Sequence, residues 1–91
     1  MPQVHFTRHL RRFFPDLADP EVVAADTAAA LIRALDARHP GLAGYLVDDA
    51  FALRKHVNVF VNGEMVADRT GLSDSLAPSD EVHVIQALSG G

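Results

Sequence analysis

Hydrophobic and polar residues alternate in three parts of the chain, and this alternation predicts β-strands. The first stretch begins at Val4, the second begins at Val57, and the third covers residues 81–88. Because successive side chains of a strand point to opposite faces, each stretch predicts one apolar and one more polar face. In the last strand we expect Val82 and Val84 on the buried face and the residues between them on the other.

The segment after the first strand predicts a hairpin with a long connection. The alternation continues weakly through residues 10–14, and Pro15-Asp16 and Asp19-Pro20 then mark a loop. Residues 21–24, with the sequence Glu-Val-Val-Ala, predict a second, short strand. We therefore expect residues 10–14 to continue the extended backbone into the loop, and residues 21–24 to return beside the first strand.

Asn62-Gly63 predicts a tight turn between two strands. The dipeptide follows the alternating residues 57–61. It is the strongest short signal of a two-residue hairpin, because both central positions of that turn need a positive φ. Residues 64–67 then predict the returning strand.

The clearest helical pattern begins after residue 27. Asp26 and Thr27 are both favourable N-cap residues, and Pro40-Gly41 ends the pattern near His39. An apolar turn or short irregular helix follows at residues 42–46. The apolar positions of the main helix fall at i, i+3, i+4 and i+7, on one face: Ala28, Leu31, Ile32 and Leu35.

These elements together predict an α+β fold in the order β-β-α-β-β-β, a mixed sheet of about five strands packed on one main helix. The first and last strands flank a crossover helix, so we expect them to lie side by side and parallel in the middle of the sheet. One helix cannot cover both faces of such a sheet. We expect the valine face to pack on the helix, and the opposite face to present Phe60 and Ile85 to solvent or to a partner.

The composition narrows the class of protein. A chain of 91 residues predicts one small domain, and 12 acidic against 8 basic residues, a formal net charge of -4, argue against a general nucleic-acid binder. No apolar run approaches the roughly 18 residues of a membrane span, and the first residues lack the pattern of a secretory signal, so we expect a cytoplasmic protein. The lack of cysteine excludes disulfides and a thiol nucleophile.

The last residues predict a reactive carboxylate on a thin arm. We divide the chain into a domain of residues 1–88 and a flexible tail, Ser89-Gly90-Gly91. Glycine has no Cβ, so two glycines after a strand make a narrow and mobile segment. The α-carboxylate is an anion near neutral pH. Such a tail can deliver this anion to the active site of another protein, whereas a frayed end or a cloning boundary is the alternative interpretation.

Several stretches together resemble the ThiS/MoaD sulfur-carrier family, including its CysO-type carriers, within the ubiquitin-like β-grasp proteins. They are Asp26-Thr27 before a helix that ends in His39-Pro40-Gly41-Leu42, the hairpin of residues 57–64, Ser79-Asp80-Glu81-Val82, and the final Gly90-Gly91. No single motif is unique to the family. Their order along nearly the whole chain is specific.

The resemblance implies a carrier and not an enzyme. In this family a ubiquitin-activating-type adenylyltransferase uses ATP to adenylate the terminal glycine, a sulfur donor converts it to a thiocarboxylate, and a sulfur-accepting synthase receives the sulfur. Gly91 would carry the acyl group and Gly90 would permit close approach in the channel. The carrier would bind no cofactor of its own and would be a monomer when alone.

The pathway stays open at this point. Many molybdopterin-synthase small subunits have a Pro-Pro pair shortly before the tail, where this chain has residues 86–89, Gln-Ala-Leu-Ser. Residues 54–58 look closer to the CysO-like branch, which serves cysteine or other metabolite synthesis, and thiamin or tRNA pathways also remain. A ubiquitin-like modifier conjugated through Gly91 is a further alternative, as is a non-catalytic binding module. The sequence does not tell whether Gly91 is the encoded end.

Other side chains are candidates for contacts with a partner and not for chemistry. His5 and His9 share a predicted strand face but would lie roughly 13 Å apart, too far to bind one metal ion, and we expect no metal site. Three arginines form the only basic cluster, at the end of the molecule where we expect the tail. The predicted partner interface consists of Phe60, Ile85, Leu88, Ser89, Arg8, Arg11 and Arg12.

Overall fold

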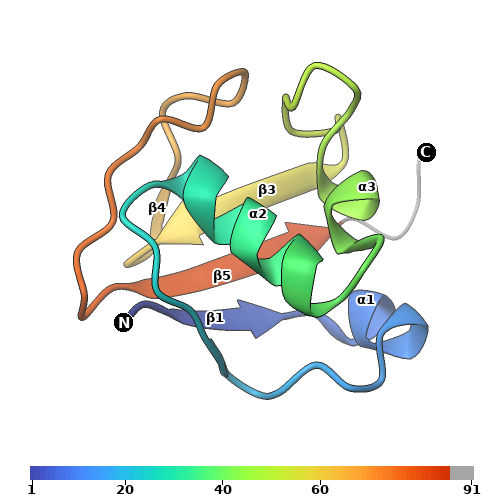
Figure 1. Cartoon of the computed structure of the whole chain (residues 1–91). Coiled ribbons are helices and arrows are strands. Elements are labelled where there is room, and N and C mark those ends of the chain that lie inside the picture. Colours follow the sequence, from blue (N-terminus) through green and yellow to red (C-terminus); the bar gives the residue numbers. More distant parts are fainter. Residues whose placement is uncertain (87–91) are drawn as a thin grey trace.

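The computed structural model describes residues 1–86, and within them a five-stranded sheet carries three helices (Figure 1). No helix in this part of the chain is long and apolar enough to cross a membrane. The predicted α+β fold with one main helix is confirmed. The elements are β1 (Gln3–Phe6), α1 (Arg8–Phe13), β2 (Glu21–Val22), α2 (Ala28–Arg38), α3 (Leu42–Leu46), β3 (Val57–Val61), β4 (Glu64–Met65) and β5 (Glu81–Gln86).

The centre of the sheet is a parallel pair made by its first and last strands. The strand order is β2-β1-β5-β3-β4, and β1 runs parallel to β5 with Val4 opposite Val82. β5 also pairs antiparallel with β3, where Val59 lies opposite Val84. The predicted central, parallel arrangement is therefore correct, and the last strand has a hydrogen-bonded neighbour on each side.

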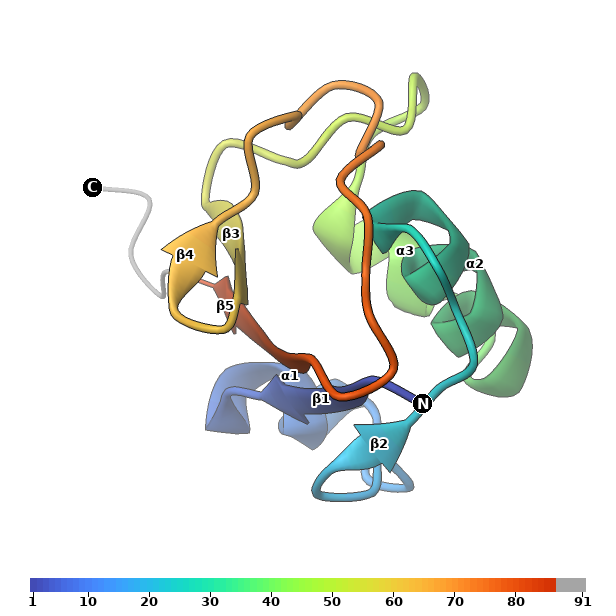
Figure 2. The same cartoon turned by 90° about the vertical axis from the view of Figure 1, so that its left-hand side faces the viewer.

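Helix α2 covers the valine face of the sheet (Figure 2). Its N-cap is Thr27, whose side chain accepts a hydrogen bond of 3.1 Å from the backbone N–H of Ala30. Each fully buried leucine or isoleucine of this helix contributes roughly 1.5–3 kcal/mol of transfer free energy. The helix buries Ala28, Ala29, Leu31, Ile32 and Leu35.

The β3–β4 turn has the geometry that its dipeptide predicts. Asn62 has a φ of 51° and Gly63 a φ of 87°, so both central residues are left-handed. The side chain of Asn62 also ties the turn to the start of β5. Its Nδ2 donates to Asp80 Oδ1 at 2.8 Å, and its Oδ1 accepts from the backbone N–H of Glu81 at 2.9 Å.

Residues 10–14 do not continue the first strand, and this prediction was wrong. Residues 8–13 form helix α1, in which Leu10 is the only buried residue. One buried position gives too little pattern to distinguish a helical period from an alternating one. Arg11 and Arg12 lie in the last turn of α1, where cations interact favourably with the helix dipole. Strands β2 and β4 are also shorter than predicted, with two residues each.

Glu21 is the one charged residue that the described part of the chain buries, with 3% of its surface exposed. Its carboxylate accepts from Arg38 Nη1 at 2.7 Å and from the backbone N–H of Ala18, and it lies 3.1 Å from His39 Nε2. Burial disfavours the charged carboxylate, but the hydrogen bonds from the backbone and from the two side chains outweigh it, so the pKa of Glu21 lies below its ordinary value. This network joins β2 to the end of α2.

We predict that Glu21→Gln lowers the free energy of unfolding by about 1.5–3 kcal/mol near pH 7, because it removes charge-assisted hydrogen bonds from a buried group. A carboxylate with a lowered folded-state pKa stabilises the fold above the unfolded pKa. The difference from wild type therefore shrinks as the pH falls below about 4.3. Denaturant titrations at several pH values measure it. The exposed Glu64→Gln serves as control, and an equal deficit at pH 7 and pH 3 contradicts this role.

Candidate functional site

The sheet has a second face, away from α2 and α3 (Figure 2), on which the sequence predicts Phe60 and Ile85. In the strand register Phe60 lies opposite His83, and Asn58 lies opposite Ile85. Ile85 is 42% exposed, while Phe60 is half-buried. Both residues thus lie on the face that the sequence predicts for them, and we call this surface the outer face.

Two histidines stack on the outer face, which the sequence analysis did not foresee. His5 of β1 lies beside His83 of β5, with ring centroids 4.6 Å apart and the ring planes at 16°. His5 Nε2 is 2.7 Å from Glu81 Oε1, and its Nδ1 is 3.7 Å from Asp19 Oδ1. The outer face is therefore apolar near Ile85 and becomes polar and acidic toward Glu81.

The point where β5 ends is partly enclosed. Gln86, the last described residue, pairs with Val57 and helps to line a cavity of about 420 Å³ together with Thr7, Arg8 and His9. The side-chain atoms Gln86 Oε1 and Thr7 Oγ1 are buried and have no hydrogen-bond partner among residues 1–86. The predicted site residues Leu88, Ser89, Gly90 and Gly91 lie outside the described residues.

The three arginines of the predicted basic cluster all belong to α1. Because α1 follows β1 and β1 is parallel to β5, the helix lies at the end of the sheet where β5 ends (Figure 1). Arg8 and Arg12 are exposed. Arg11 is half-buried, and its Nη1 lies 3.8 Å from Oδ2 of the exposed Asp19 in the same chain.

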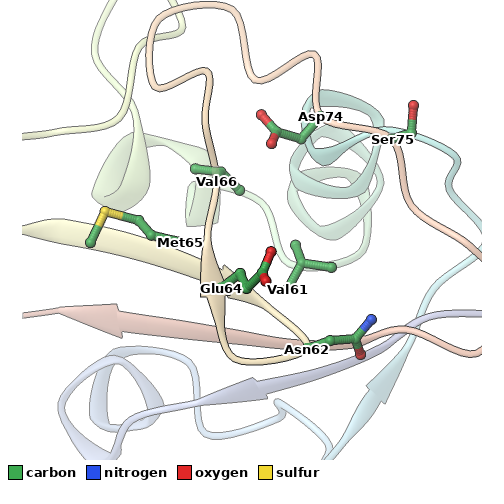
Figure 3. Close-up of a pocket in the computed structure, with 7 residues that line it drawn as sticks. All are labelled: Val61, Asn62, Glu64, Met65, Val66, Asp74 and Ser75. Carbon is green, nitrogen blue, oxygen red and sulfur yellow. The ribbon is translucent and has the colours of Figure 1, made fainter.

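A second cavity, of about 400 Å³, lies beside the β3–β4 hairpin and away from the end of β5 (Figures 1 and 3). Its lining includes Glu64, Asp74 and Ser75, and none of the lining residues is a histidine or lysine that could act as a base toward the serine. Asp74 accepts hydrogen bonds from the backbone N–H groups of Ala67 and Asp68 at 2.8 and 2.9 Å. Its carboxylate therefore organises the loop.

The carboxylate of Asp68 has a similar structural role. Ser73 Oγ donates to it at 2.6 Å, and the backbone N–H groups of Gly71 and Ser73 add hydrogen bonds of 2.9 and 3.2 Å. These donors stabilise the charged form and hold the pKa of Asp68 well below its usual range. Among the described residues, no group of three or more histidine, aspartate or glutamate side chains is placed to hold a metal ion.

A five-stranded mixed sheet with a central parallel pair and one main covering helix defines a ubiquitin-like β-grasp protein. More narrowly, the chain belongs to the ThiS family, whose model matches residues 4–91. The matched range includes the final two glycines.

Two curated relatives and two solved structures are similar to this chain. The chain is 37% identical over 65 residues to small archaeal modifier protein 3 of Haloferax volcanii, covering 71% of this chain and 70% of the relative. It is 34% identical over 70 residues to the sulfur carrier protein CysO of Mycobacterium tuberculosis, covering 75% of each.

The crystal structure of that CysO superposes with a TM-score of 0.83 and 28% identity, over 97% of this chain and 100% of the other. A chain in the Amycolatopsis orientalis BexX/CysO complex superposes with a TM-score of 0.85 and 25% identity, over 100% of both chains. The relatives thus include both a CysO sulfur carrier and a small archaeal modifier protein, and the link to molybdopterin is less direct.

The register of β5, which buries Val84 and exposes Ile85, can be tested directly by one substitution on each face. We predict that Val84→Ala, at 2% exposure, lowers the free energy of unfolding by about 2 kcal/mol, because it removes two buried methyl groups and leaves a cavity. Ile85→Ala, one residue further and 42% exposed, should cost less than about 1 kcal/mol. Parallel denaturant titrations compare the two variants. A larger loss for Ile85→Ala would mean that the faces are exchanged.

Proposed function

We propose that this protein is a sulfur carrier whose Gly91 carboxylate is adenylated and then converted to a thiocarboxylate. The observation that carries the proposal is the position of β5 in the middle of the sheet, where β1 pairs with its residues 81–84 and β3 pairs with its residues 82–86. The five residues that follow Gln86, Ala-Leu-Ser-Gly-Gly, are thus attached to a central strand. The match of the family model through residue 91 supports the same reading.

The chemistry explains why such a carrier needs a partner. A carboxylate resists nucleophiles because it is already an anion. Attack of a carboxylate oxygen on the α-phosphorus of ATP forms the acyl-adenylate and releases pyrophosphate. Sulfide, or its equivalent from a sulfur donor, then attacks the acyl carbon, so that a C–S bond forms and the C–O bond to AMP breaks. The product is a thiocarboxylate on Gly91, with AMP as the leaving group.

The outer face is the surface that we assign to partner proteins. Ile85 and Phe60 offer apolar area on the strand that leads to the tail and on its neighbour, and apolar surface that remains exposed on a small domain often marks an interface. Leu88 and Ser89 would extend this contact toward Gly90. In this proposal ATP is bound by the activating adenylyltransferase, and the acceptor is a synthase of cysteine or related metabolite synthesis, as the likeness to CysO suggests.

A second candidate function is conjugation to other proteins. The observation that favours it is the 37% identity to a small archaeal modifier protein. Such a modifier uses the same acyl-adenylate, but the nucleophile is a lysine amine and the product is an isopeptide bond. Lys55 is the only lysine of this chain, so chains of copies linked through different lysines cannot form.

We predict that the protein isolated from its native host contains a fraction in which one C-terminal oxygen is replaced by sulfur. Intact-mass spectrometry detects the resulting gain in mass. An alkylating reagent that is selective for thiocarboxylates should label the sulfur-bearing form. Deleting Gly91 should abolish both the mass gain and sulfur transfer, because no carboxylate then reaches the channel. In a matched variant, one alanine is appended after Gly91, which lengthens the tail instead of shortening it. This variant should also lose the mass gain and sulfur transfer, because Gly91 then has no free carboxylate.

The two candidate functions differ in what accumulates. High-mass conjugates that disappear when Gly91 is deleted, without any sulfur-bearing form, would overturn the carrier in favour of the modifier. Full biological activity of the alanine-extended protein would overturn both, because each reaction starts from a free Gly91 carboxylate.

A further inference from the structure

The basic residues of this acidic protein are concentrated at one end. Arg8 and Arg12 lie on α1, and Arg54 and Lys55 lie just before β3. The first residue of β3, Val57, pairs with Gln86, so the two segments flank the end of β5 on opposite sides. These residues, which we call the cationic collar, are half of the 8 lysines and arginines in a chain of net charge -4. All of them are exposed.

The carboxylates are arranged differently. Asp80 and Glu81 lie at the start of β5, at the far end of the sheet from the collar, and Glu64 lies beside them at the β3–β4 turn (Figure 1). Asp19 is near α1, but it faces Arg11 and His5. Asp48, in the loop after α3, accepts from the backbone N–H groups of residues 50 and 52. The carboxylates at the start of β5 and at the β3–β4 turn therefore lie at the opposite end of the sheet from the collar.

The collar is exposed but not unstructured. Arg54 Nε donates to the carbonyl oxygen of Gly44 at 2.8 Å, which fixes the stem of this segment against α3. Arg8, Arg12 and Lys55 form no ion pair with any of residues 1–86. Exposed positive charges that have no ion-pair partner among residues 1–86 favour an anionic surface from outside this domain.

A cavity of about 420 Å³ lies beside the collar. It is lined by Thr7, Arg8, His9 and Gln86, so one collar residue faces a recess at the end of β5. A side chain of a docked protein could enter this recess while carboxylates of the same protein face the collar.

We propose that the cationic collar docks onto an acidic rim around the mouth of the channel that receives the tail. This inference rests on the proposed function, and the partner is the activating adenylyltransferase. The collar segments lie on either side of β5, and neighbouring strands are about 4.8 Å apart, so the backbones of the two sides are roughly 10 Å apart. This separation suits a spread of several carboxylates on the partner.

Charge reversal in the collar provides the test. The full chain, with Gly91 intact, is assayed for ATP–pyrophosphate exchange with the adenylyltransferase of its own host. We expect Arg8→Glu/Arg12→Glu/Lys55→Glu to raise the KM for the carrier at least about tenfold at about 0.05 M salt, with kcat within about twofold, because steering charges act on association. Near 1 M salt, where the Debye length is about 3 Å, the difference should largely disappear.

Single variants keep the test informative if the triple variant does not fold. Arg12→Glu and Lys55→Glu should each raise KM about two- to fivefold at low salt. Arg33→Glu makes the same change of charge on α2, outside the collar, and should leave KM unchanged. Thermal unfolding followed by circular dichroism shows whether each variant is folded, and the single variants decide the matter if the triple variant is not.

The possible failures are distinguishable. If the wild-type chain supports no exchange, the proposed function is overturned and the collar with it. If wild type is active and the collar variants match Arg33→Glu, the function stands and the collar is wrong. A raised KM for ATP with an unchanged KM for the carrier would show that the collar contacts nucleotide, which also overturns the acidic protein rim.

Discussion

The parallel pairing of β1 with β5 is the constraint on which the rest of the structure depends. Parallel neighbours cannot be joined by a tight turn, so the chain between them must cross over, and α2 makes this crossing on the valine face. The same pairing places the last strand inside the sheet rather than at an edge. Residues that follow Gln86 therefore start from a strand that is hydrogen-bonded on both sides, at the end where α1 also lies.

One strand register decides both stability and the surface left for partners. The register that buries Val82 and Val84 under α2 turns His83 and Ile85 to the outer face. A slip of one residue would exchange the two faces, placing an imidazole in the core and valines in water. Core packing and partner recognition are thus not independent properties of β5. A substitution on the outer face of β5 can therefore strengthen partner binding only if it leaves the register that buries Val82 and Val84 intact.

The sequence predicted correctly the elements that depend only on residues close together in the chain. Asn62-Gly63 can adopt two positive φ angles, and Thr27 can cap a helix, whatever the rest of the chain does. Helix α1 has only Leu10 buried, so its local pattern was too weak to predict it. The stack of His5 on His83 and the cavity at Gln86 arise from residues more than 75 positions apart in the chain, which only the sheet register brings together. The role of Gly91, by contrast, was predicted from covalent chemistry, and it stays a prediction because the residue lies outside the described part of the chain.

The proposed division of labour follows from what the domain offers. The carboxylates of Glu21, Asp68 and Asp74 accept hydrogen bonds from the backbone and from neighbouring side chains, and thereby stabilise the fold. A carrier can dispense with an acid or base if a rigid sheet delivers its terminal carboxylate to another active site, because tethering raises the effective concentration there. Selectivity then depends on which partners can accept the outer face and the cationic collar together.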